Sequence, residues 1–242
     1  MSEDFNIKGP NSPLQEKIAN QRVYFIRKLV DRHQAQTLIE QKKGKLAKAG
    51  KNVNDVIIKS LEPGYNTYVR VRGEYRIVYL RKKHLSITTA PNVIGAKVFD
   101  EIIDLGAPEP FGKGKSKGKT LTIDFVEKVL YQDEKELAFN PDGKSIDPQE
   151  IVHMKLEDAP SDFLETHKDQ ISILKVSPEL AIEKLRLSIM NRPTDAQRIL
   201  EEVFEVPLIQ IILSPVFNVV LEYKETEHRF LVDAVSGKVT KI

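Results

Sequence analysis

The stretch from Val216 to Tyr223, VFNVVLEY, alternates cleanly between two faces, with an apolar or aromatic side chain at every second position. This period of two predicts a half-buried β-strand. A second strand is predicted over Arg229–Asp233, and a closing strand over Val239–Ile242. Gly237 lies in the tight connection before the closing strand, where a residue without a Cβ can adopt a positive φ. The end of the chain therefore predicts three strands joined by short turns.

Working outward from these strands, the preceding segment predicts two helices and one more strand. Ser177 and Pro178 form a helix-start signal, and apolar residues follow at helical spacing at Ala181, Ile182, Leu185 and Ile189. Thr194 begins a second predicted helix, whose inner face carries Ile199, Leu200, Val203 and Phe204. Pro207 and Pro215 bracket the apolar run Leu208–Leu213, which predicts a buried strand of limited length.

The order of these signals resembles the PepSY family of small α+β modules. A helix opens with Ser-Pro-x-x-Ala at Ser177, Pro178 and Ala181. A strand then runs into the pattern Val-Asp-Ala-x-x-Gly-Lys-Val, at Val232, Asp233, Ala234, Gly237, Lys238 and Val239. The resemblance covers roughly the last quarter of the chain. It implies a non-catalytic module that acts by interaction or inhibition.

The first half of the chain predicts a similar mixture of helix and sheet. A long helix is predicted over Leu14–Lys48 and another over Pro91–Leu105. Between them, Tyr65–Thr89 predicts a three-stranded antiparallel meander with turns at Gly73-Glu74 and at Arg81 to His84. Further strands are predicted within Leu121–Leu137 and over Ile151–Leu156, with a turn at Asn140 to Gly143.

These elements predict an α+β fold, with an N-terminal helix packed on the meander and a second α+β unit ending in the PepSY-like module. We divide the sequence into a basic α+β domain over residues 1–106 and a Gly/Lys-rich linker or loop over 107–119. An acidic, mainly β segment then covers residues 120–176, and the PepSY-like module covers 177–242.

Composition limits the kinds of site and the cellular compartment that we expect. The chain contains no cysteine, which excludes disulfides, thiol catalysis and thiolate-held metal sites. The N-terminal residues lack the basic and apolar regions of a signal peptide, and no run approaches the roughly 20 apolar residues of a membrane span. We expect a cytoplasmic protein without a membrane span.

Charge is distributed unevenly along the chain. Residues 1–120 hold 23 Lys and Arg against 12 Asp and Glu, whereas residues 121–242 hold 14 against 23, giving net charges of +11 and −9. This asymmetry suggests a basic surface for an acidic partner. It could equally let the two halves attract each other within one chain, or between copies in a homo-oligomer.

The predicted meander carries a candidate nucleic-acid platform. Its aromatic residues can stack on bases while its cations meet phosphates. The candidate residues are Tyr68, Arg70, Arg72, Tyr75, Arg76, Arg81, Lys82 and Lys83, with Lys113, Lys115, Lys117 and Lys119 of the glycine-rich loop. An ordinary amphipathic sheet and a plain tether explain the same pattern.

No catalytic motif is present. The five histidines show no metal-binding spacing, and neither a nucleophile elbow nor a Walker A loop occurs. His153 with Asp158 is the one candidate acid–base pair, and a structural role explains it as well. We expect a non-enzymatic binding or adaptor protein without a cofactor, whose basic half engages nucleic acid or an acidic protein and whose C-terminal half contacts protein. The alternatives are an assembly protein that pairs its basic and acidic halves, and an enzyme without a recognisable motif.

Overall fold

The protein is mostly β, so the predicted α+β class is wrong. The computed structural model describes residues 5–50, 52–98, 100–106, 118–152, 155–160 and 162–242. Among the described residues, 52% lie in strands and 19% in helices, and nine strands form one mixed sheet. The chain divides into two compact units. Unit 1 comprises residues 1–15, 76–132 and 192–203, and unit 2 comprises residues 16–75, 133–191 and 204–242.

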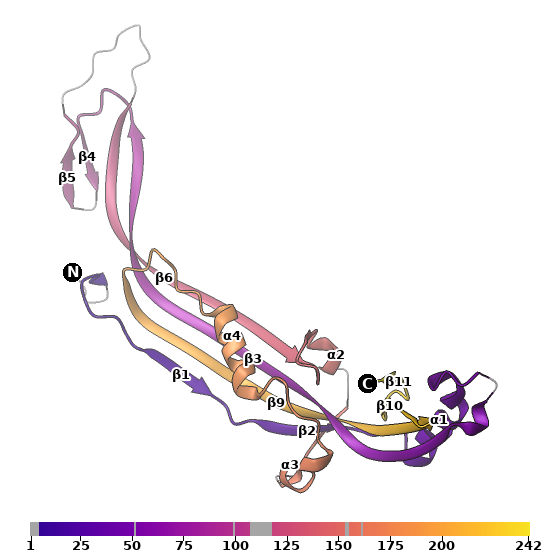
Figure 1. Cartoon of the computed structure of the whole chain (residues 1–242). Coiled ribbons are helices and arrows are strands. Elements are labelled where there is room, and N and C mark those ends of the chain that lie inside the picture. Colours follow the sequence, from indigo (N-terminus) through magenta and orange to yellow (C-terminus); the bar gives the residue numbers. More distant parts are fainter. Residues whose placement is uncertain (1–4, 51, 99, 107–117, 153–154, 161) are drawn as a thin grey trace. The chain divides into compact units, whose positions relative to one another are not determined.

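Three long strands dominate the sheet and pass through both units: β3 (Ile57–Thr89), β6 (Lys119–Phe139) and β9 (Arg198–Tyr223) (Figure 1). The strand order is β11-β10-β9-β3-β6-β7. In unit 2, Arg70 pairs with Glu136 and Arg72 with Glu134, so β3 and β6 are antiparallel. In unit 1, Arg76 contacts Glu201 while Gln197 N donates to Leu80 O, so β3 and β9 are antiparallel as well.

The predicted meander is wrong because β3 continues through both of its proposed turns. Gly73 lies in the middle of β3, where an added Cβ would lie 2.7 Å from Leu185 Cδ2 and 3.0 Å from Glu205 O. This glycine therefore permits close packing of a helix on the strand. Residues 81–84 form no turn either, because β3 continues through them. Arg81 pairs with Glu127 of β6 and with Asp195, and His84 contacts Asp124 of β6.

The predicted helix over Leu14–Lys48 is replaced by two strands and one shorter helix. β1 (Leu14–Ile18) and β2 (Arg22–Ile26) both pair with β9, and β2 does so in parallel. The helix α1 (Arg32–Leu46) begins only after Asp31, which forms a capping box with Gln34. Pairing with β9 thus overrides the helical pattern of the first apolar residues.

Several other predicted helices are also absent. The segment predicted as helix over Pro91–Leu105 forms a two-stranded hairpin of β4 (Gly95–Val98) and β5 (Glu101–Asp104). The helix predicted from Thr194 is instead a bend followed by β9, which runs through Pro207 and Pro215 without ending. The strand predicted over Ile151–Leu156 also differs, because Ile151 lies in the short helix α2 (Gln149–Val152) and the strand β8 (Leu156–Asp158) begins only at Leu156.

Other sequence predictions are confirmed. Helix α4 (Pro178–Ile189) begins at the Ser177 cap, whose side chain accepts from Leu180 N, and its predicted apolar residues are buried. β10 (Thr226–Asp233) pairs with β9 and β11 (Val239–Lys241) pairs with β10, as the C-terminal pattern predicts. Asn140 to Gly143 forms the predicted turn before β7 (Ser145–Ile146). The remaining short helices are η2 (Val53–Asp55), α3 (Phe163–Thr166) and η3 (Lys168–Gln170).

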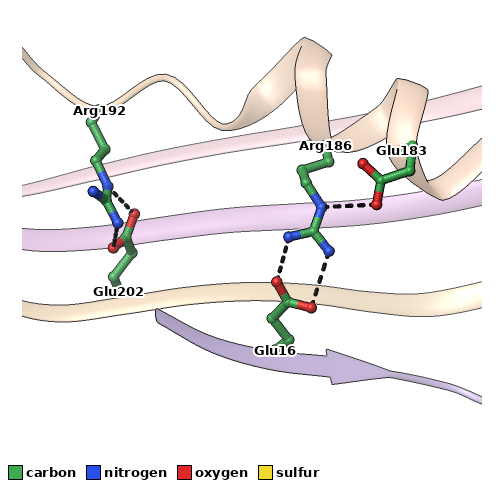
Figure 2. A network of polar contacts seen from close by, with 5 residues as sticks. All are labelled: Glu16, Glu183, Arg186, Arg192 and Glu202. Carbon is green, nitrogen blue, oxygen red and sulfur yellow. Dashed lines mark hydrogen bonds and ion pairs between the residues drawn. The ribbon is translucent and has the colours of Figure 1, made fainter. Parts of the chain in front are cut away.

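Unit 2 holds an apolar core between α1 and the C-terminal strands. Ala35 and Ile39 of α1 pack against the apolar face of β9 and β10, which carries Phe217, Val219, Leu221, Phe230 and Val232. Helix α4 is held to β1 by Arg186, whose guanidinium pairs with Glu16 (Figure 2). The same guanidinium lies over the Phe204 ring. In unit 1, the fully buried Glu202 accepts two hydrogen bonds from Arg192 at 2.7 and 2.6 Å (Figure 2).

Candidate interaction arm

The proposed nucleic-acid residues of β3 lie on opposite faces of the strand. Tyr75 is fully buried and Tyr79 is 3% exposed, so neither ring has a free face for a base. Arg70, Arg72 and Arg76 lie on the other face, together with the half-buried Tyr68. Burial raises the pKa of the Tyr68 hydroxyl above its ordinary value. The structure therefore does not bring Tyr75 and Tyr79 together with the arginines on one surface.

Carboxylates from neighbouring strands occupy the arginines of this face. Arg70 Nε donates to Glu136 at 2.6 Å and Arg72 pairs with Glu134. Arg76 donates to Glu201 at 2.5 Å.

Arg81 lies between two carboxylates, at 2.6 Å from Glu127 and 2.8 Å from Asp195. The hydrogen bond from Arg81 lowers the pKa of the Asp195 carboxyl below its ordinary value. The four arginines of the candidate platform are therefore all engaged within the chain.

These ion pairs also account for the charge asymmetry of the sequence. Their cations come from the first 120 residues and their carboxylates from the last 122, as in the pairing of Lys59 with Glu222 and Glu227. Each of them lies within one unit. Attraction between the two halves of one chain, one of the alternatives left open by the sequence, is therefore realised across the strands.

The candidate lysines are placed differently. Lys82 is exposed, and Lys83 lies 3.9 Å from Asp195. Lys119 begins β6, and its ammonium group donates to Val93 O and Gly106 O. It therefore links the start of β6 to the residues on either side of the β4–β5 hairpin. Lys113, Lys115 and Lys117 lie outside the described residues, as does His153 of the candidate acid–base pair. Among the residues that the structure does describe, no group of three or more His, Asp or Glu side chains could hold a metal ion.

The most distinctive surface of unit 1 is a two-stranded arm, which we define as residues 82–89 of β3 and 119–126 of β6 (Figure 1). The last contact of β3 toward β9 is at Leu80, just before Arg198 begins β9. Beyond this point, β3 and β6 have only each other as strand partners among the described strands. Each strand of the arm therefore has one edge without a strand partner among the described strands.

The two faces of the arm differ in chemistry. His84 Nδ1 lies 2.6 Å from Asp124 Oδ1, which puts the even-numbered residues of both strands on one polar face. The opposite face carries apolar residues of both strands, namely Leu85, Ile87, Leu121, Ile123 and Phe125. Leu121 is buried, whereas Leu85 is 50% exposed and Ile87 is 41% exposed. The arm is thus an amphipathic ribbon whose apolar face is partly open.

The β4–β5 hairpin of the same unit adds further exposed apolar side chains. Ile102 is 82% exposed and Ile94 is 61% exposed. The sequence signal for these features was a period-two pattern over Leu85 to Thr89 that we interpreted as the last strand of a meander. It correctly predicted a strand there, but it contained no sign that one face lacks a covering layer.

Comparisons with protein-family models, curated proteins and solved structures find no match to this chain. The PepSY resemblance of the C-terminal region stays a prediction. Among the described helices, none is long and apolar enough to cross a membrane.

Proposed function

We propose that this chain is a non-catalytic binding protein that engages another protein through the arm of unit 1. The observation that carries the proposal is the open apolar face of the arm, with Leu85 and Ile87 half exposed on a ribbon of only two strands. Isolated two-stranded ribbons are marginally stable in water unless another layer covers their apolar face. A partner protein would supply that layer.

The free edges of the arm offer a second mode of contact. A strand at the edge of a sheet presents unpaired N–H and C=O groups, to which an extended segment of another protein can add. Apolar side chains on one face and open backbone groups on the edge suit a protein partner better than nucleic acid, whose phosphates require free cations. The arginines beside the arm are already paired with carboxylates.

Nucleic-acid binding by the Tyr and Arg residues of β3 stays a prediction, and so does binding of protein by the C-terminal strands. The arm is favoured over both because its apolar side chains are exposed, whereas Tyr75 is buried and the arginines are neutralised.

A photo-crosslinking amino acid in the arm tests the proposal. With the crosslinker at position 87 of the full chain, illumination in the producing cells should give an adduct of discrete mass that contains a second protein. The same crosslinker at position 187 is the matched control, because Leu187 is 83% exposed on α4 in unit 2.

The Leu85→Asp substitution should abolish the adduct at position 87 while leaving the melting temperature nearly unchanged, because the side chain is half exposed. Adducts of equal yield at positions 87 and 187, or adducts at 87 that survive Leu85→Asp, would contradict the proposal. An adduct that contains only a second copy of this chain would identify the partner as the protein itself.

A further inference from the structure

A separate feature of unit 2 lies between β1 and β2, where the strand pairing beside β9 is interrupted. β1 and β2 both run alongside β9: Ala19 N donates to Val206 O, and Arg22 is the register partner of Gln210. Between them, residues 19–21 leave the strand conformation opposite Pro207. Val206 O faces β1 and accepts from Ala19 N, so the nitrogen of Pro207 in the same trans peptide unit faces the opposite side of β9.

A pocket of about 310 Å³ opens at this interruption. It is lined by Ala19, Asn20, Arg22, Tyr24, Pro207, Leu208, Ile209 and Gln210. This volume is at the lower end of the range for small-molecule sites. Arg22 is the only ionised side chain in the lining, and no carboxylate contributes to it.

One polar row crosses the sheet and ends at the pocket. Arg70 Nε donates to Glu136 at 2.6 Å, and Arg70 Nη1 donates to Gln210 Oε1 at 3.0 Å. Gln210 is only 7% exposed, and its oxygen is occupied by Arg70. The backbone of Gln210 is also the register partner of Arg22 in the parallel pairing of β2 with β9.

The open end of this row contains donors without acceptors. Within the described part of the chain, neither Arg22 nor Gln210 Nε2 donates to any residue. The side chains of Asn20 and Tyr24 are likewise free of hydrogen bonds to described residues. Eight of the eleven arginines have partners among the described residues, and Arg22 is one of the three that do not.

We propose that this pocket binds a small organic carboxylate, with Arg22 and Gln210 Nε2 donating to its carboxylate and Leu208 and Ile209 packing against its apolar body. A planar guanidinium matches the two oxygens of a carboxylate, and a single cation balances a single negative charge. The apolar wall selects ligands with a short hydrocarbon chain over acetate. This inference is independent of the arm and of its proposed function.

Titration of the full chain with hexanoate, followed by NMR chemical shifts, tests the proposal. Hexanoate should bind saturably, while hexanamide of the same shape should bind at least about tenfold more weakly because it lacks the charge. Acetate should also bind more weakly, because it lacks the methylene groups that cover Leu208 and Ile209.

Two arginine variants locate the site. Arg22→Gln should weaken hexanoate binding about tenfold or more, since charge-assisted hydrogen bonds are lost. Arg32→Gln is the matched control, because Arg32 is also exposed and unpaired among the described residues, and it should bind as the unmodified chain does. Both variants should keep the melting temperature of the unmodified chain.

Three results would overturn the assignment. They are equal binding of hexanoate and hexanamide, equal losses in the Arg22 and Arg32 variants, and no saturation of the unmodified chain up to about 100 mM hexanoate, a concentration at which even very weak sites fill.

Discussion

Arg186 shows how one side chain secures a helix to the sheet. Its Nη2 donates to Glu16 Oε2 of β1 at 3.0 Å, and Nη1 contacts the other carboxylate oxygen. Its Nε lies 3.5 Å from Glu183 without forming a hydrogen bond (Figure 2). Its guanidinium lies 4.9 Å from the centre of the Phe204 ring. The Arg186 guanidinium thus contacts β1, its own helix and a ring of the core.

This pairing predicts an acid-sensitive contribution to stability. The hydrogen bond from Arg186 lowers the pKa of the Glu16 carboxyl below its ordinary value of 4.5. A carboxyl with a lowered folded-state pKa stabilises the fold above its unfolded pKa and loses that effect as the pH falls through the folded pKa. Glu16→Gln should therefore lower the free energy of unfolding by about 0.5–1 kcal/mol near pH 7 and by much less near pH 3.

Urea unfolding of both chains at the two pH values measures this difference. Glu165→Gln is the control, because Glu165 is exposed and has no partner among the described residues. If the loss caused by Glu16→Gln is the same at both pH values, the ion pair is not its cause.

At the scale of elements, the packing of α4 on β3 depends on a position without a side chain. Gly73 lies 2.7 Å, measured from an ideal Cβ, from Leu185 Cδ2. Leu185 is fully buried, so it has little room to move.

Gly73→Ala should therefore lower the free energy of unfolding by about 1–3 kcal/mol, as overpacked cores do. Gly95→Ala in β4 is the matched control, because its Cβ would meet only Ile103 O at an ordinary 3.5 Å. Denaturant unfolding of both variants, and of Gly73→Ala in a Leu185→Ala background, measures the effect. A loss that persists undiminished after Leu185 is shortened would exclude this contact as the cause.

Gly73 also explains why the sequence predicted which residues lie in strands better than it predicted where each strand ends. Period two correctly marked strand residues in β3, β9 and β10, and the Ser177-Pro178 signal correctly marked the start of α4. A Gly-Glu pair inside such a pattern has the local chemistry of a turn. Whether it turns depends on α4, which comes more than a hundred residues later and packs on the glycine.

Prolines misled the interpretation in the same way. Pro207 and Pro215 lie within β9 rather than at its ends. The pocket residues Arg22 and Gln210 are brought together only by the parallel pairing of β2 with β9. No local pattern in the sequence marks that pairing, and we therefore missed this site.

At the scale of the whole molecule, four arginines and one lysine of the first sequence half pair closely with carboxylates of the second half. The unmodified chain should therefore bind single-stranded nucleic acid weakly and with a shallow dependence on salt. Glu134→Gln/Glu136→Gln frees Arg72 and Arg70, and it should raise the affinity by about tenfold at low salt.

Glu222→Gln/Glu227→Gln is the matched control, because it changes the net charge equally but frees Lys59 and Arg229 rather than arginines of β3. Binding measured across a salt series distinguishes the cases. Tight, steeply salt-dependent binding by the unmodified chain that Arg70→Glu/Arg72→Glu abolishes would show that the paired arginines still serve nucleic acid.

The parallel placement of β1 and β2 beside β9 has a consequence for biosynthesis. Ser12 Oγ donates to Leu200 O, a contact between residues 188 positions apart. Such a high contact order slows folding, because the ends of a long loop must meet before any pairing energy is gained. At ordinary translation rates, β1 and β2 remain without their partner for on the order of ten seconds while the ribosome makes the rest of the chain. We therefore expect a nascent chain that stalls before β9 to be a substrate for chaperones, and the sheet of unit 2 to close only after most of the chain has been made.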